Sequence, residues 1–328
     1  MKGLKQGLIR GLIYLVFLIL LIVLLFGHSD IPLNELKAKY ALTSSDFMRL
    51  EGMDVHYADE GNHSDSLPLV LIHGTGASLH TFNGWTEDLK EDHRVIRMDL
   101  PGYGLTGPFP DGDYSMNTYV AFLKAFLDKM KIDRCVLGGN SLGGEIAWRF
   151  ALNYPEKLER LILIDAAGYP NRESSEPIAF KIAKIPVLKN ALKFITPRFV
   201  ARSSLENVYG ESSLVTDDLV DRYFELTLRE GNRQAFIDRF AVVKDPGAYQ
   251  HISLIEVQTL ILWGGKDRLI PLELAYRFHD DLPNDTLIIL PNLGHVPMEE
   301  DPEQSLKPVS YFLKEKGEFE SSGIQKFQ

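Results

Sequence analysis

The stretch that most constrains this chain is Cys135–Glu145, CVLGGNSLGGE, in which one serine stands with a glycine two residues away on each side. An apolar strand pattern precedes Ser141 and a helical pattern begins at Leu142, so this is a G-x-S-x-G motif between a strand and a helix. Such a sharp turn strains the serine backbone, and a side chain at Gly139 or Gly143 would crowd the neighbouring elements. The motif predicts a serine hydroxyl held at the positive end of a helix. A glycine-rich turn that merely contains serine is the alternative.

The rest of the chain alternates between apolar strands and amphipathic helices. Buried strands are predicted at residues 67–72, 95–100, 135–137, 161–164, 260–263 and 287–290. Helices are predicted at residues 82–89, 117–130, 142–150, 273–279 and 305–313, and a hairpin at 47–57. Strands that alternate with helices form parallel sheets with right-handed crossovers. We therefore expect an α/β fold whose mostly parallel central sheet carries helices on both faces.

The alternation stops between residues 169 and 253, where amphipathic helical segments and prolines replace the buried strands. An insertion of this size after one strand is best interpreted as a helical cap over the carboxyl ends of the strands, where open α/β sheets bind ligands. The predicted core comprises residues 46–168 and 254–316. Residues 29–45 are expected to be a linker with a short helix, and residues 317–328 a C-terminal tail.

The first 28 residues are predicted to lie outside the globular domain. Residues 11–27 contain no charged side chain and follow the basic residues Lys2, Lys5 and Arg10. The run is at the short end of the range that spans a bilayer, and no A-x-A-like cleavage site ends it. We expect residues 1–28 to form a single-pass anchor with a cytoplasmic N-terminus and an extracytoplasmic main domain. Secretion after cleavage of a signal peptide is the alternative.

Charge and cysteine content argue against a nucleic-acid-binding protein and against a protein stabilised by intrachain disulfides. The net charge of −10 disfavours nucleic acid as a partner. The single cysteine, Cys135, rules out an intrachain disulfide framework and is interpreted as a small buried residue of the strand before the serine.

Two further loops supply the partners that a nucleophilic serine needs. Asp267 lies in the loop after the strand ending at Trp263, and His295 lies in the loop after the strand ending at Leu290. The order Ser, Asp, His with each residue after a separate strand is that of the α/β-hydrolase triad. His295 would take the proton of Ser141, and Asp267 would orient the imidazole. A turn histidine and a helix-capping aspartate are the structural alternatives.

Asp165, which also ends a predicted strand, is the rival to Asp267 as the triad acid. The oxyanion of an acyl-transfer intermediate needs backbone donors, and the N–H groups of Thr75 and Leu142 are the candidates. His73, directly before the loop of Thr75, is expected to brace that loop, and Asp99 to hold a structural turn. No histidine pattern typical of a metal site occurs, so we expect neither a metal nor a cofactor.

Taken together, these motifs resemble the α/β-hydrolase superfamily, specifically its capped serine-hydrolase branch, over residues 47–315. Dehalogenases and epoxide hydrolases of similar sequence carry aspartate where this chain has Ser141, and the neighbours Asn140 and Leu142 differ from the elbow of proline iminopeptidases. Esterases and carbon–carbon hydrolases of ring-fission products share the Gly-Asn-Ser-Leu-Gly-Gly pattern. The resemblance is carried by His73–Gly76, Asp99–Gly104, Gly139–Gly144 and the loops of Asp267 and His295.

The predicted function is that of a membrane-anchored serine carboxylesterase acting on a small, lipid-like ester. The first loop, Gly74–Ser78, lacks the Gly-Pro-Gly form frequent in ring-fission hydrolases, which favours an esterase. A carbon–carbon hydrolase with the same triad is the alternative enzyme. A binding protein that keeps the fold without catalysis is a third hypothesis, although such a protein needs neither a triad nor an oxyanion loop.

A basic, apolar stretch lies within the predicted cap. Residues 177–205 contain no acidic residue, and apolar side chains alternate with the basic ones. This pattern suits the surface of an anionic bilayer, although a cap that roofs a pocket with a solvated outer face would look similar. The basic residues are Lys181, Lys184, Lys189, Lys193, Arg198 and Arg202.

Overall fold

The described strands form one nine-stranded sheet in the order β1-β2-β4-β3-β5-β6-β7-β8-β9. The computed structural model describes residues 2–170, 177–185, 189–242, 247–314 and 325–326. β1 pairs antiparallel with β2, and β2 with β4, while the remaining neighbours pair in parallel, so the predicted mostly parallel sheet is confirmed. The strands are β1 Ser45–Leu50, β2 Met53–Gly61, β3 Leu69–Ile72, β4 Arg94–Met98, β5 Cys135–Asn140, β6 Leu158–Ile164, β7 Thr259–Gly264, β8 Asp285–Leu290 and β9 Gln325–Lys326.

Helices cover both faces of the sheet, as expected. Successive residues of a strand point to opposite faces, so Leu137 of β5 joins one apolar cluster and Val136 joins the other. The first cluster includes side chains of α4, α5 and α10, and the second includes side chains of α3 and α12. These helices are α3 Asn83–Leu89, α4 Met116–Lys129, α5 Leu142–Asn153, α10 Glu273–Asp281, α11 Pro297–Glu300 and α12 Pro302–Lys314.

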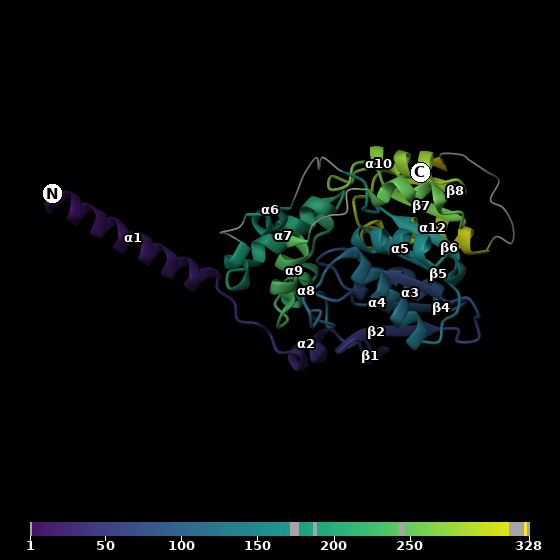
Figure 1. The fold of residues 1–328 in the computed structure, drawn as a ribbon, viewed down its shortest axis with the longest axis horizontal. Coiled ribbons are helices and arrows are strands. Elements are labelled where there is room, and N and C mark those ends of the chain that lie inside the picture. The colour runs from purple at the N-terminus through teal and green to yellow at the C-terminus, as the bar shows by residue number, and fades with distance from the viewer. Residues whose placement is uncertain (1, 171–176, 186–188, 243–246, 315–324, 327–328) are drawn as a thin grey trace.

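A separate helical layer lies between β6 and β7 in sequence and beside the sheet in space (Figure 1). Parts of the predicted cap at residues 171–176, 186–188 and 243–246 lie outside the described residues. The helices of this layer are α6 Ile178–Ala183, α7 Arg198–Val208, α8 Asp217–Thr227 and α9 Asn232–Ala241. We call the layer the cap and keep its boundaries as a prediction.

The N-terminal helix α1, Lys2–Phe26, extends away from the sheet beside the cap (Figure 1). Its segment Lys5–Phe26 has a mean hydropathy of 3.0, so it is long and apolar enough to cross a membrane. No residue in the most apolar part of this segment is buried. The short helix predicted in the linker is α2, Leu33–Tyr40.

Most of the predicted C-terminal tail, 317–328, lies outside the described residues. Its described part, β9, pairs in parallel with Ile288 and Ile289 of β8. This edge strand is not predicted from the sequence.

Candidate active site

The turn at Ser141 has the strained geometry that its glycines predict. Ser141 stands at φ 55° and ψ −115° between β5 and α5, a backbone conformation that residues with side chains seldom adopt. A Cβ atom at Gly139 would lie 2.2 Å from the carbonyl oxygen of Gly143, and one at Gly143 would lie 2.3 Å from that of Ile72. Only glycine fits these two positions, so the close packing of β3, β5 and α5 holds the serine in place.

The structure brings Asp267 and His295 into direct contact. Nδ1 of His295 lies 2.7 Å from Oδ2 of Asp267, and both side chains are buried. The other carboxylate oxygen of Asp267 accepts hydrogen bonds from the N–H groups of Leu269 and Ile270 at 2.7 and 3.0 Å. These bonds hold the carboxylate in place, and the carboxylate in turn orients the imidazole ring of His295. The contact uses Nδ1 and leaves Nε2 available.

Two residues that the sequence analysis did not assign hold the loop of His295. The side-chain amide of Asn140 donates to the carbonyl oxygens of His295 and Ile164 at 2.9 and 3.1 Å. The buried carboxylate of Glu300 accepts from the N–H of Gly294 at 2.7 Å and from that of Gly210, in the cap, at 3.0 Å. Asn140 therefore ties the histidine loop to the serine turn, and Glu300 ties the same loop to the cap.

The rival acid, Asp165, lies beside the same pair. A carboxyl oxygen of Asp165, a carboxyl oxygen of Asp267 and a ring nitrogen of His295 all lie within 4.8 Å of one another. Oδ1 of Asp165 accepts from the N–H of Gly264 at 2.9 Å. Burial and the negative charge of Asp267 raise the pKa of Asp165 well above its usual range. The protonated form of Asp165 is therefore favoured next to the carboxylate that contacts His295.

The candidate oxyanion donors lie at two chain segments beside Ser141. Leu142 is the first residue of α5, so its N–H has no acceptor within the helix. Thr75 belongs to the loop after β3, whose Gly74 lies so close to the serine turn that an added Cβ would be 2.9 Å from Cβ of Ser141. The loop and the helix start thus face the same space, which is the arrangement an oxyanion site needs.

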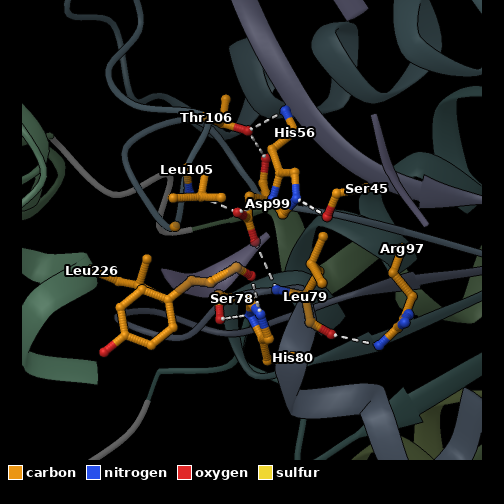
Figure 2. A network of polar contacts seen from close by, with 12 residues as sticks. Ser45, His56, Ser78, Leu79, His80, Arg97, Asp99, Leu105, Thr106 and Leu226 are labelled. Atoms are coloured by element: carbon orange, nitrogen blue, oxygen red, sulfur yellow. Dashed lines mark hydrogen bonds and ion pairs between the residues drawn. The ribbon is translucent and has the colours of Figure 1, made fainter. Parts of the chain in front are cut away.

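A buried hydrogen-bond network around Asp99 holds that loop (Figure 2). Oδ1 of Asp99 accepts from the N–H of Leu79 at 2.7 Å, while Oδ2 accepts from the N–H of Leu105 at 2.7 Å and contacts Nδ1 of His56 at 2.6 Å. The imidazole of His56 also contacts the hydroxyl of Ser45 at 2.6 Å. The contacts with His56 outweigh burial and hold the pKa of Asp99 below its usual range. The sequence predicted a structural turn at Asp99, but not its partner His56.

His73 braces the loop, as expected. Its Nδ1 lies 2.8 Å from the carbonyl oxygen of Gly74, and its Nε2 accepts from the N–H of Leu100 at 3.0 Å. Burial lowers its pKa, so the imidazole is neutral with its proton on Nδ1. Both ring nitrogens are engaged, which leaves His73 no free lone pair with which to act as a base.

Three of the candidate residues, Ser141, His295 and Thr75, line a cavity of about 670 Å³. The cap supplies most of the remaining wall, and α1 contributes Ile22. That wall is largely apolar, and Arg233 is the one lysine or arginine among the described lining residues. The cavity has the size and character of a small-molecule site.

Comparison with known proteins identifies the family. A sequence model of the alpha/beta hydrolase fold matches residues 68–302. The chain belongs to this family. Its relatives include the 2-hydroxy-6-oxo-2,4-heptadienoate hydrolase of Pseudomonas putida, which is 27% identical over 79% of this chain and 92% of the relative.

Two solved structures share the fold. A thermophilic esterase from Thermogutta terrifontis has a TM-score of 0.68 and 24% identity, covering 82% of this chain and 96% of its own. A membrane phospholipase A has a TM-score of 0.71 and 24% identity, covering 95% of this chain and 98% of its own. This protein is therefore a hydrolase of the alpha/beta hydrolase family, and the proteins to which it is similar include a dienoate hydrolase, an esterase and a phospholipase.

Proposed function

We propose that this α/β-hydrolase is a membrane-anchored serine carboxylesterase. The observation that carries the proposal is the 2.7 Å contact of Asp267 with His295, which lines the same cavity as Ser141. The oxygen of Ser141 attacks the ester carbonyl carbon while His295 accepts its proton, and the N–H groups of Thr75 and Leu142 stabilise the oxyanion. The alcohol leaves with the proton of His295. Water, activated by the same imidazole, then hydrolyses the acyl-serine.

The largely apolar cavity wall favours an ester with an apolar acyl group, and α1 supports attachment to a membrane. The basic residues before the apolar run support a cytoplasmic N-terminus, with the catalytic domain on the other side. Ile22 of α1 lines the cavity, so removal of residues 1–28 as a signal peptide would take away part of its wall.

One observation favours the alternative carbon–carbon hydrolase. The dienoate substrates named for the Pseudomonas putida relative carry a carboxylate, and Arg233 places a buried cation in the cavity wall. In this protein, however, Nε and Nη2 of Arg233 already bind Asp30 at 3.2 and 2.5 Å. The carboxylate of Asp30 therefore offsets the positive charge of Arg233, which the carboxylate of such a substrate would need as its partner.

The proposal is tested with the full-length protein in detergent and in vesicles. We expect a fluorophosphonate probe to label Ser141, and nitrophenyl esters to be hydrolysed faster than a vinylogous diketone. Ser141→Ala should lower ester turnover by on the order of 10⁴-fold or more and leave the circular dichroism spectrum unchanged. Faster cleavage of the diketone than of every ester would support the alternative enzyme, and neither labelling nor turnover would support a binding protein.

A further inference from the structure

The last turns of α1 pack against the cap. The rings of Phe26 and Phe199 meet edge to face with their centres 5.9 Å apart. Directly after the helix, Gly27 forms a β-bridge with Ile195, and the N–H of His28 donates to the carbonyl oxygen of Phe194 at 3.1 Å. The end of the membrane helix is therefore part of the cap surface and not a loose attachment to it (Figure 1).

Residues 27–40, which we call the strap, continue along the cap. The N–H of Ile31 donates to the carbonyl oxygen of Leu228 at 2.8 Å, and Asp30 binds Arg233. Farther along, Lys39 and Tyr40 bind the carboxylate of Glu225 at 2.7 and 2.8 Å. Contacts spread over the whole strap fix the position of the cap relative to α1.

The cavity that holds Ser141 extends to α1. Ile22 lines it, and Ile22 and Phe26, one helical turn apart, are the half-buried side chains of the last two turns of α1. Leu24, between them in sequence, is 81% exposed and points elsewhere. Ile178, Ile195 and Phe199 line the cavity from the cap.

The cap surface beside α1 is apolar and exposed. Phe194 is 66% exposed and Phe199 57% exposed, and Ile178 is exposed as well. Large apolar groups in water are unfavourable, whereas the same groups beside a membrane helix can lie in the acyl region of the bilayer. Two of the basic residues of this stretch, Arg198 and Arg202, bind the carboxylate of Asp217, which offsets part of their charge.

We propose that the end of α1 forms one wall of an acyl channel, so that the ester substrate is a membrane lipid whose acyl chain passes from the bilayer, between α1 and the cap, to Ser141. The hydrolysis in this proposal rests on the function proposed above, whereas the channel itself rests on the contacts of Ile22 and Phe26. Because the channel wall belongs to the anchor, the bilayer presents substrate directly to the cavity, without passage of the acyl chain through water.

The test compares Ile22→Trp with Leu24→Trp in full-length protein reconstituted into vesicles of phosphatidylcholine and phosphatidylglycerol. Nitrophenyl palmitate embedded in the bilayer and soluble nitrophenyl acetate share a leaving group and differ in acyl chain. A tryptophan at position 22 narrows the channel, so kcat/KM for palmitate should fall about ten-fold, the scale on which an apolar pocket discriminates its ligands. Acetate turnover should fall much less than palmitate turnover, because the short acyl group does not extend along the channel, and Leu24→Trp should match wild type for both esters.

Equal palmitate turnover in the two variants would overturn the channel. Failure of the wild type to hydrolyse either ester would instead contradict the proposed function, and a second measurement then judges the channel without turnover. Palmitic acid that carries a diazirine close to its carboxyl group, added to the same vesicles, should cross-link to the inner cavity wall at Val296 or Leu269. This labelling should fall in Ile22→Trp and not in Leu24→Trp, and equal labelling in both would also overturn the channel.

Discussion

The serine turn and the cap meet at one cavity, but different forces hold them. Backbone geometry holds the serine turn, because Gly139 and Gly143 leave no room for a side chain and Ser141 stands at a positive φ. Side-chain contacts hold much of the cap: Phe180, Phe236 and Phe240 cluster within it, and Asp30 of the strap binds Arg233. The reacting groups thus lie on a rigid support, while the substrate-facing wall depends on contacts that can be changed one at a time.

This difference predicts where substitutions act. A change at the strand ends should alter the chemical step for every substrate, because the reacting atoms move or lose their charge. A change in the cap, the strap or α1 should alter which substrates reach Ser141. Variants that break this division would show that the cap also positions the reacting groups, for which Glu300 offers a route through its bonds to Gly210 and Gly294.

Among changes at the strand ends, a large loss of turnover is expected at the triad acid. Asp267→Asn should lower ester turnover by about 10⁴-fold, because the amide removes the negative charge that orients and stabilises the imidazole. Asp165→Asn should lower it by less than about ten-fold, because burial and the charge of Asp267 raise the pKa of Asp165 and so favour its protonated form, which an amide resembles. Steady-state turnover of nitrophenyl acetate by the two purified variants measures both effects.

The pair also serves as its own control, since both carboxyl groups are buried beside His295. Comparable melting temperatures would show that loss of turnover in Asp267→Asn is not loss of fold. Should Asp165→Asn be the more damaging change, the acid has been assigned to the wrong carboxyl group.

The second effect is on stability, through the network that holds the oxyanion loop. Burial lowers the pKa of His80 to about 4, whereas an unfolded histidine titrates near pH 6.5. The unfolded chain therefore binds the extra proton first as the pH falls, and stability present above about pH 6.5 is lost towards pH 4. Between about pH 6.5 and 5 the loss from this group is about 2 kcal/mol.

Urea unfolding at pH 7 and pH 5 measures this loss. His80→Gln keeps a donor for the carbonyl oxygen of Tyr40, which His80 now contacts at 2.8 Å, and cannot titrate, so its stability should depend less on pH. His73, whose pKa burial also lowers, leaves a remaining slope of the same sign. His63→Gln, at an exposed position, should keep the wild-type dependence, and an unchanged slope in His80→Gln would contradict the assignment to His80.

The sequence predicted the sheet and the order of the strand-end loops because both follow from local patterns. Apolar runs mark buried strands, and the glycines around Ser141 mark a turn that only glycine permits. The order of the residues along the chain favoured Asp267 over Asp165 as the triad acid, and the contact of Asp267 with His295 is consistent with that choice. The position of His73 directly before the loop of Thr75 was also sufficient to predict that it braces this loop.

Residues that act through distant contacts could not be predicted in this way. Asn140 binds the backbone of His295, and Glu300 binds the backbone of the cap, so neither role requires a partner side chain that a motif would reveal. Ile22 and Leu24 are equivalent as apolar residues of one helix, and only the packing of α1 on the cap distinguishes them. The strap was predicted as a linker because its contacts with Glu225 and Arg233 join segments far apart in sequence.

The smallest effect is expected at the strap, where Asp30→Asn removes the carboxylate that binds Arg233. Arg233 is 6% exposed, so it loses its charge partner in a place where water compensates poorly; Asp30 is 43% exposed, which limits the cost to about 1 kcal/mol. Asp54→Asn breaks a pair with Arg49 in which both side chains are more than half exposed, so its stability should be unchanged within about 0.5 kcal/mol. Thermal unfolding in detergent compares the two variants. If Asp30→Asn melts at the same temperature as the wild type, this ion pair of the strap does not stabilise the cap. The contrast between a serine turn held by backbone geometry and a cap held by side-chain contacts would then not extend to the strap.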